Sequence, residues 1–150
     1  MRTMRTKKQI TTWIEAKKLS VRRTNMFGQE CELEPGVKFF ILMLEKLGAV
    51  TEWSCEGRPQ GFYIVFSAPL DVAKKIHRCG FFSVELEGGT TNGQTRWSLR
   101  AHHVHDEQER QMVLRWAATA WANTFGPLTV YSDKPVKKKK HAQRRNVRQN

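Results

Sequence analysis

The sequence predicts an α+β fold with a four-stranded antiparallel sheet, built from two αββ units and followed by a C-terminal amphipathic helix (αββαββα). Two helical patterns are each followed by two apolar extended segments, and such units form one sheet with helices on one face. Gly48 precedes Glu56-Gly57 much as Gly80 precedes Glu87-Gly88, which indicates an internal repeat. Lys and Arg gather at the two chain ends, which predicts basic flexible arms there.

The first unit begins at Pro35, a residue suited to the first turn of a helix. Apolar residues follow at helical spacing and Gly48 ends the helix, which predicts a buried helix over 35–47. The residues on its apolar side are Val37, Phe40, Ile41, Leu44 and Leu47. Strands are predicted over 49–56 and 61–68, joined by the Gly- and Pro-containing turn between them.

The second unit repeats this order. The spacing of Leu70, Ala73 and Ile76 predicts a helix over 69–79, and Gly80 closes it. Strands are predicted over 81–87 and 95–101.

The third helix has the clearest boundaries. Asp106 has the side chain of an N-cap, and Glu109 stands at the spacing of a capping box. Gly126-Pro127 stops the helix, and a short apolar segment over 128–131 is expected to add an edge strand.

The N-terminal stretch predicts a short helix over 8–19, with a connector over 20–34. A helix of this length is unstable alone, so it must dock or bind a ligand. Trp13 is expected to anchor it to the folded body; stacking of Trp13 on an unpaired base is the alternative interpretation.

The net charge of +12 is unevenly distributed. Residues 1–25 hold eight Lys or Arg and one acid, giving +7, and residues 134–150 hold eight and none, giving +8. Residues 26–133 hold ten bases and thirteen acids, giving −3. We therefore expect a basic N-terminal arm with a short helix (1–25), a single α+β domain (26–133) and a basic disordered tail (134–150).

The arms are predicted to contact DNA or RNA phosphates, because bound Lys and Arg release the counterions condensed on nucleic acid. The candidate residues are Arg2, Arg5, Lys7, Lys8, Lys17, Lys18, Arg22, Arg23, Lys137, Lys138, Lys139, Lys140, Arg144, Arg145 and Arg148. A solubilising tail or a nuclear-import signal over 137–145 is the alternative interpretation. The predicted function is non-enzymatic: a ribonucleoprotein accessory protein, or a phage or mobile-element inhibitor of a nucleic-acid-processing complex.

The acidic body is predicted to contact a partner protein or to self-associate through an exposed sheet face. Alternation along a strand would place Glu52, Ser54 and Glu56 on one face, with Trp53 and Cys55 on the other beside alternate residues of 62–66. Glu85 and Glu87 would likewise share a face. The alternative function is a metal-dependent nuclease, in which these carboxylates act with the histidines His102, His103 and His105.

The predicted order of elements resembles that of homing endonucleases of the LAGLIDADG type, as a likeness of topology only. That resemblance implies an acidic metal ligand at the end of each of two equivalent helices. The corresponding positions hold Leu47-Gly48-Ala49 and Cys79-Gly80-Phe81, which argues against cleavage. The sequence lacks paired metal ligands and phosphate-loop or nucleophile motifs, so we expect no metal, no cofactor and no catalytic residue.

The expected location is cytoplasmic, or nuclear in a eukaryotic host. No apolar run is long enough to span a membrane, and the first residues lack the apolar core of a secretory signal. Cys31, Cys55 and Cys79 are odd in number and widely spaced, which is typical of reduced thiols.

Overall fold

The computed structural model describes residues 3–24, 27–56, 61–91, 94–101 and 106–135. The chain divides into two compact units. One contains residues 1–10 and 129–150, and the other contains residues 11–128.

The larger unit contains the predicted sheet. Its strands are β4 (Val50–Cys55), β5 (Tyr63–Ala68), β6 (Ser83–Thr91) and β7 (Gln94–Arg100), in the order β4-β5-β7-β6. All three neighbouring pairs are antiparallel, which confirms the predicted α+β class and four-stranded sheet. The second strand of each αββ unit, β5 or β7, lies at the centre.

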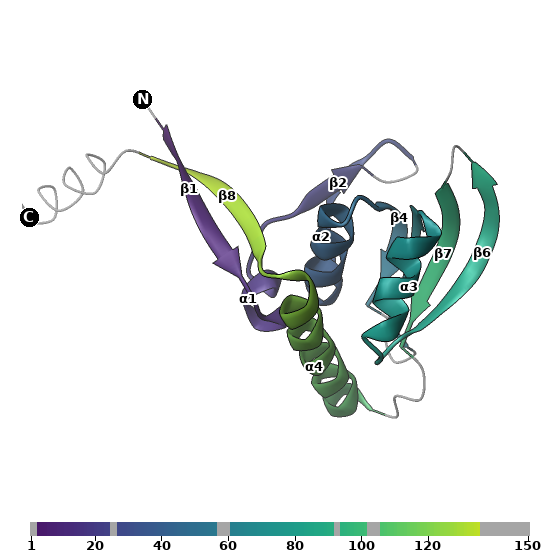
Figure 1. Ribbon diagram of the computed structural model, residues 1–150. Helices are drawn as coiled ribbons and strands as arrows, with labels where there is room; N and C mark the ends of the chain where they lie inside the picture. The colour runs from purple at the N-terminus through teal and green to yellow at the C-terminus, as the bar shows by residue number, and fades with distance from the viewer. Residues whose placement is uncertain (1–2, 25–26, 57–60, 92–93, 102–105, 136–150) are drawn as a thin grey trace, which may run out of the picture. The chain divides into compact units, whose positions relative to one another are not determined.

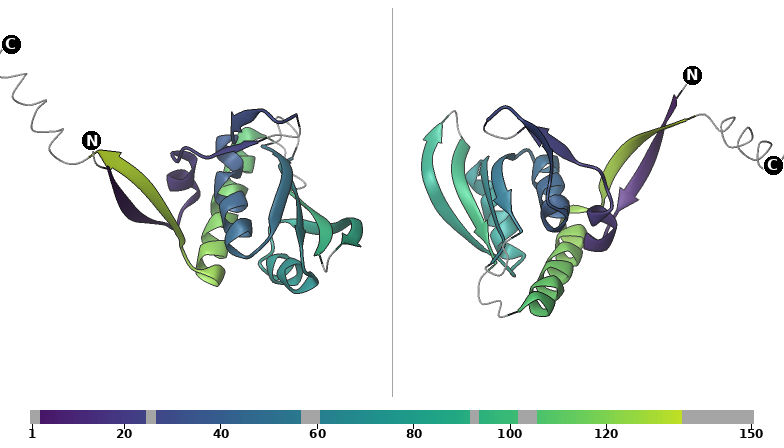
Figure 2. Two further views of the ribbon diagram at one scale, coloured as in Figure 1. Left: turned by 90° about the horizontal axis from the view of Figure 1, so that it is seen from above. Right: turned by 180° about the vertical axis from the view of Figure 1, so that it is seen from behind.

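Three helices cover one side of this sheet, as Figures 1 and 2 show. They are α2 (Lys38–Lys46), α3 (Leu70–Arg78) and α4 (Glu107–Phe125), and a single 3₁₀ turn, η1 (Pro35–Val37), precedes α2. As predicted, the Asp106 side chain caps α4 by accepting a hydrogen bond from Glu109 N at 2.7 Å. Gly126 ends α4 with a φ of 87°, a left-handed value that favours glycine.

Aromatic side chains form the centre of the core between the helices and the sheet. Phe40 of α2 has ring-centroid distances of 5.3 Å to Phe62, 5.2 Å to Phe82 and 5.0 Å to Trp121, all edge-on. Phe40, Phe62 and Trp121 are completely buried. Burial of such a side chain contributes about 1.5–3 kcal/mol, so this cluster fixes the helices on the inner face of the sheet.

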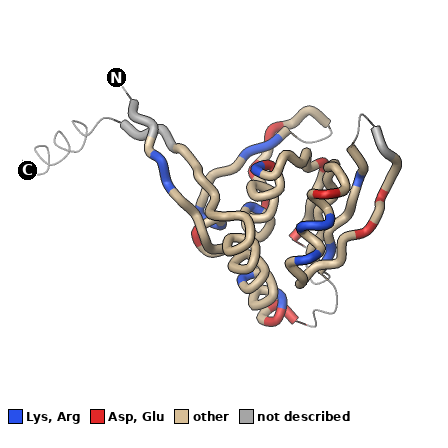
Figure 3. The backbone as a smooth tube through the Cα atoms, in the orientation of Figure 1, with Lys and Arg blue, Asp and Glu red and all other residues tan. Residues whose placement is uncertain are grey.

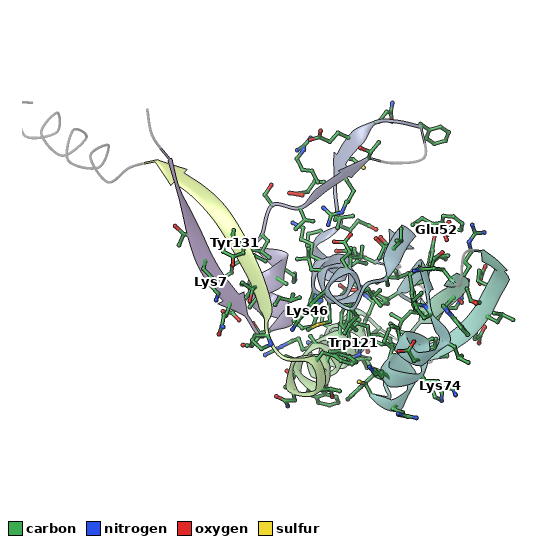
Figure 4. The ribbon with its side chains drawn as sticks, turned by 45° about the horizontal axis from the view of Figure 1, so that its top comes forward. Lys7, Lys46, Glu52, Lys74, Trp121 and Tyr131 are labelled. Carbon is green, nitrogen blue, oxygen red and sulfur yellow. The ribbon has the colours of Figure 1, made fainter. Side chains whose placement is uncertain are left out.

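Lysine 46 joins α2 to the end of α4. Its Nζ donates hydrogen bonds to the carbonyl oxygens of Phe125 at 2.8 Å and Pro127 at 2.9 Å (Figure 4). These bonds satisfy carbonyl groups that a helix C-terminus leaves without a partner.

The N-terminal stretch differs from the predicted helix over 8–19. Residues up to Ile10 form strand β1 (Thr3–Ile10), and only Trp13–Lys17 form a helix, α1. Thr12 Oγ1 accepts a hydrogen bond from Glu15 N at 3.1 Å, and the Glu15 carboxylate accepts one from Thr11 N at 3.2 Å. This capping arrangement starts the helix after Thr12, so the stretch before it stays extended.

The predicted connector over 20–34 contains a small hairpin of β2 (Arg22–Thr24) and β3 (Glu30–Glu32). Arg22 lies opposite Glu32, and Thr24 lies opposite Glu30. The strands have three residues each, fewer than the usual five or six, and carry no apolar alternation that a sequence pattern would show.

The segment after α4 forms β8 (Leu128–Pro135), which includes the edge strand predicted over 128–131. Strand β8 pairs with β1 in a separate two-stranded sheet, so it does not extend the four-stranded one. The two strands run in opposite directions in Figure 1. We call this pair the terminal ribbon.

Candidate nucleic-acid interface

The terminal ribbon brings the two basic ends of the chain together. The unit that contains it, residues 1–10 and 129–150, holds twelve Lys or Arg and one acid, a formal charge of +11. Residues 11–128 hold fourteen Lys or Arg and thirteen Asp or Glu, a formal charge of +1. Almost the whole net charge therefore belongs to one unit.

Strand β1 supplies exposed cations to this ribbon. Lys7 and Lys8 are both exposed, and as neighbours in a strand they point to opposite faces. Among the side chains over 6–24, 27–56, 61–89, 94–101 and 106–131, no carboxylate lies within ion-pair distance of either amine. Tyr131 of β8 is 54% exposed, so the ribbon also presents an aromatic ring. Figure 3 shows a stretch coloured as Lys or Arg along β1.

The candidate residues between 11 and 25 lie in the larger unit. Lys17 Nζ lies 4.3 Å from the centroid of the Trp13 ring, whereas Lys18 is exposed at the end of α1. Arg22 pairs with Glu30 at 2.6 Å. Arg23 pairs with both oxygens of Glu45, at 2.5 and 3.2 Å. The charges of Arg22 and Arg23 are therefore already compensated within the fold.

Trp13 is an anchor, as predicted. It is only 2% exposed, and its Nε1 donates a hydrogen bond to Gly36 O at 2.9 Å. An indole held in this way has no exposed face for a base.

Several candidate residues lie outside the described residues. They are Arg2, Lys137, Lys138, Lys139, Lys140, Arg144, Arg145, Arg148 and the histidines His102, His103 and His105. Arg5 lies in β1, where the structure describes its backbone position.

The sheet has a second face, opposite the helices, which we call the outer face. In an antiparallel sheet, directly opposed residues share a face, so the register identifies its members. Two rows cross the strands: Trp53, Val65, Ser98 and Glu85, and then Cys55, Tyr63, Arg100 and Ser83. Ser67 and Arg96 form a third row beside them.

A bulge changes which residues of β4 reach the outer face. The register shifts between Thr51 and Trp53, so Glu52 and Trp53 both lie on the outer face while Ser54 lies opposite the buried Ile64. The predicted grouping of Glu52 with Ser54 and Glu56 is therefore wrong. The predicted grouping of Trp53 and Cys55 with the apolar residues of 62–66 is also wrong, because Phe62, Ile64 and Phe66 lie on the inner face.

Arginine side chains stack on both aromatic rings of the outer face. Arg96 Cζ lies 5.7 Å from the centroid of Trp53, and Arg100 Cζ lies 5.3 Å from that of Tyr63. The Glu52 carboxylate (Figure 4) holds Arg96 through hydrogen bonds of 2.7 and 2.9 Å. This carboxylate also accepts a hydrogen bond from Ser67 Oγ at 3.2 Å.

The four carboxylates considered for a nuclease have different surroundings. Glu56 is 4% exposed and accepts a hydrogen bond from Gly36 N, whereas Glu52 is occupied by Arg96. Glu85 and Glu87 are exposed. Within the described ranges, no three His, Cys, Asp or Glu side chains are grouped closely enough to hold a metal ion.

Two further features follow from the described part of the chain. None of its helices combines the length and apolar character needed to cross a membrane. No disulfide joins Cys31, Cys55 and Cys79.

Comparisons with known proteins leave the structure itself as the basis for a functional proposal. No family model matches the chain, and neither a curated protein nor a solved structure is significantly similar to it.

Proposed function

We propose that this protein is a non-enzymatic nucleic-acid-binding protein whose terminal ribbon binds the phosphate backbone of DNA or RNA. The observation that carries the proposal is the pairing of β1 with β8, which joins two distant basic segments in one unit with a charge of +11. A concentrated positive charge attracts polyanions and accelerates their association.

The shape of the ribbon fits this role. A two-stranded antiparallel ribbon is narrow enough to enter the major groove of DNA. Exposed lysines on both of its faces, Lys7 and Lys8, allow contacts to phosphates on either side. The near-neutral larger unit adds little long-range attraction, so the ribbon and the basic tail dominate the electrostatics.

The magnitude of the salt dependence follows from the number of contacts. If about six of the twelve bases meet phosphates of duplex DNA, log K falls with log salt at a slope of about −5. The affinity then drops by about a thousandfold between about 50 and 200 mM salt.

The test compares two charge-matched double variants of the full chain. Lys7→Gln/Lys8→Gln removes two positive charges from the ribbon, and Lys74→Gln/Lys75→Gln removes two from exposed positions on α3. Binding to duplex DNA is measured by fluorescence anisotropy over a series of salt concentrations.

The ribbon variant is expected to reduce the slope by about 1.8, because each lost phosphate contact contributes about 0.9. The α3 variant keeps the wild-type slope. Equal slopes of log K against log salt for the two variants would contradict the proposal, since the reduced salt dependence would then reflect net charge alone.

A further inference from the structure

The outer face of the sheet has the composition of a stacking surface. The helices of the larger unit lie on the other side (Figure 2), and on this face Trp53 and Glu85 are exposed whereas Val65 and Ser98 are buried. Trp53 is 41% exposed and Tyr63 is half-buried, and each ring has an arginine stacked on it. We infer that this face binds single-stranded nucleic acid by stacking its unpaired bases.

The stacked groups are held in place before any ligand arrives. Glu52 grips both the Nε and an Nη of Arg96, which fixes the guanidinium plane beside Trp53. A bulge in β4 makes this possible, because it brings Glu52 and Trp53 to the same face. A flat group whose orientation is already fixed loses little freedom on binding.

The spacing of the rings favours an unstacked strand. Trp53 lies opposite Val65, which is two residues from Tyr63 on the adjacent strand. Two residues along a strand and one strand across place the two Cα atoms about 8 Å apart. Neighbouring bases in a duplex rise by about 3.4 Å and hide their faces against each other. Rings carried on backbone positions this far apart suit a strand whose bases are splayed out.

The same face carries polar groups that have no partner among the described residues. Of the described carboxylates, none forms an ion pair with Arg100, so its charge is available to a phosphate. The hydroxyls of Ser83 and Ser98 are buried on this face, and neither has a hydrogen-bond partner in the described part of the chain. A buried polar atom without a partner is costly, so a ligand that supplied a hydrogen bond to either hydroxyl would be held more tightly.

The inference rests on the proposed function for the attraction of the strand, and its test separates the two. The full-length protein is titrated with a single-stranded oligothymidine and with a duplex of the same length. Trp53→Leu/Tyr63→Leu removes both rings, and Trp116→Leu is the matched control, since Trp116 is 56% exposed on α4. A second variant, Arg96→Lys, keeps the charge but loses the planar group that Glu52 holds.

Loss of each ring is expected to weaken single-strand binding about tenfold, with duplex binding changed less than about twofold. Arg96→Lys weakens single-strand binding in the same selective way, and Trp116→Leu changes neither. Lys7→Gln/Lys8→Gln, by contrast, is expected to lower the affinity for both the single strand and the duplex. If the ribbon proposal fails, this variant lowers neither affinity, and the effect of the outer-face variants is unchanged.

Two results would overturn the inference. In the first, Trp53→Leu/Tyr63→Leu and Arg96→Lys lower the affinities for single strand and duplex equally, or lower neither affinity. The other is a self-associated wild type that Trp53→Leu/Tyr63→Leu converts to monomers with single-strand binding intact, which would make the outer face a protein interface. Thermal unfolding of each variant identifies any that fails to fold, and the milder Arg96→Lys then decides.

Discussion

Glu56→Ala is expected to destabilise the larger unit strongly, because Glu56 connects β4, η1 and α4. It follows β4, its carboxylate accepts a hydrogen bond from Gly36 N of η1, and its own N–H donates to Glu34 Oε1 at 2.9 Å. Its carbonyl accepts a hydrogen bond from Arg110 of α4 at 2.9 Å, and Gly36 O accepts the Trp13 indole of α1.

The expected cost is about 2–3 kcal/mol. Truncation leaves the buried Gly36 N–H without an acceptor, which costs about 1–3 kcal/mol, and it also removes negative charge near the buried Arg110. Arg110 donates hydrogen bonds to the Glu107 carboxylate, which raises the pKa of the guanidinium, so Arg110 remains charged in every variant. Glu56→Gln keeps an acceptor for Gly36 N and is expected to lose about 1 kcal/mol.

Urea unfolding followed by tryptophan fluorescence measures both variants, with Glu85→Ala as the control on an exposed glutamate. The control should stay within about 0.5 kcal/mol of wild type. A Glu56→Ala variant as stable as Glu85→Ala would refute the structural role and return Glu56 to the set of candidate ligands.

Two further outcomes are expected within the larger unit. Trp13→Phe keeps the ring but loses the bond to Gly36 O, so the free energy of unfolding should fall by about 1 kcal/mol in urea titrations. For Glu32, burial raises the carboxyl pKa, but the bond from Val21 N at 2.7 Å and the charge of Lys38 lower it, and the pKa lies below its ordinary value. The lowered pKa means that ionised Glu32 stabilises the folded state. This stabilisation is present above the unfolded pKa of about 4.3 and is lost as the pH falls through the folded pKa. Hydrogen exchange should therefore show the Val21 amide protected at neutral pH and exposed in acid, and Glu32→Gln should remove that difference.

Local patterns were sufficient to predict the two αββ units and the C-terminal helix. The apolar spacing of 35–47, the Asp106 cap and the Gly126 stop correspond to α2 and α4 in the structure. The capping box of Thr12 and Glu15 was also present in the sequence, and it would have shortened the predicted N-terminal helix.

Features that depend on distant residues had no local signal. Strands β1 and β8 lie at opposite ends of the chain, and neither shows an apolar alternation that identifies its partner. The bulge that brings Glu52 and Trp53 to the same face depends on the pairing of β4 with β5. Strict alternation, which has no bulge, therefore assigned the residues of β4 to the wrong faces. The candidate stacking face became visible only with the cross-strand register.

The proposed function depends on the pairing of β1 with β8, and a variant that breaks this pairing tests it without changing the charge. Ladder hydrogen bonds alternate along a strand, so Val130→Pro/Tyr131→Pro removes an N–H directed at β1 whichever residue donates it. Val130→Thr/Tyr131→Thr keeps the ladder and serves as the control. If the ribbon arranges the basic residues, the proline variant binds duplex DNA about tenfold more weakly than the threonine variant at equal salt. Equal affinity of the two variants would show that the termini act as independent arms.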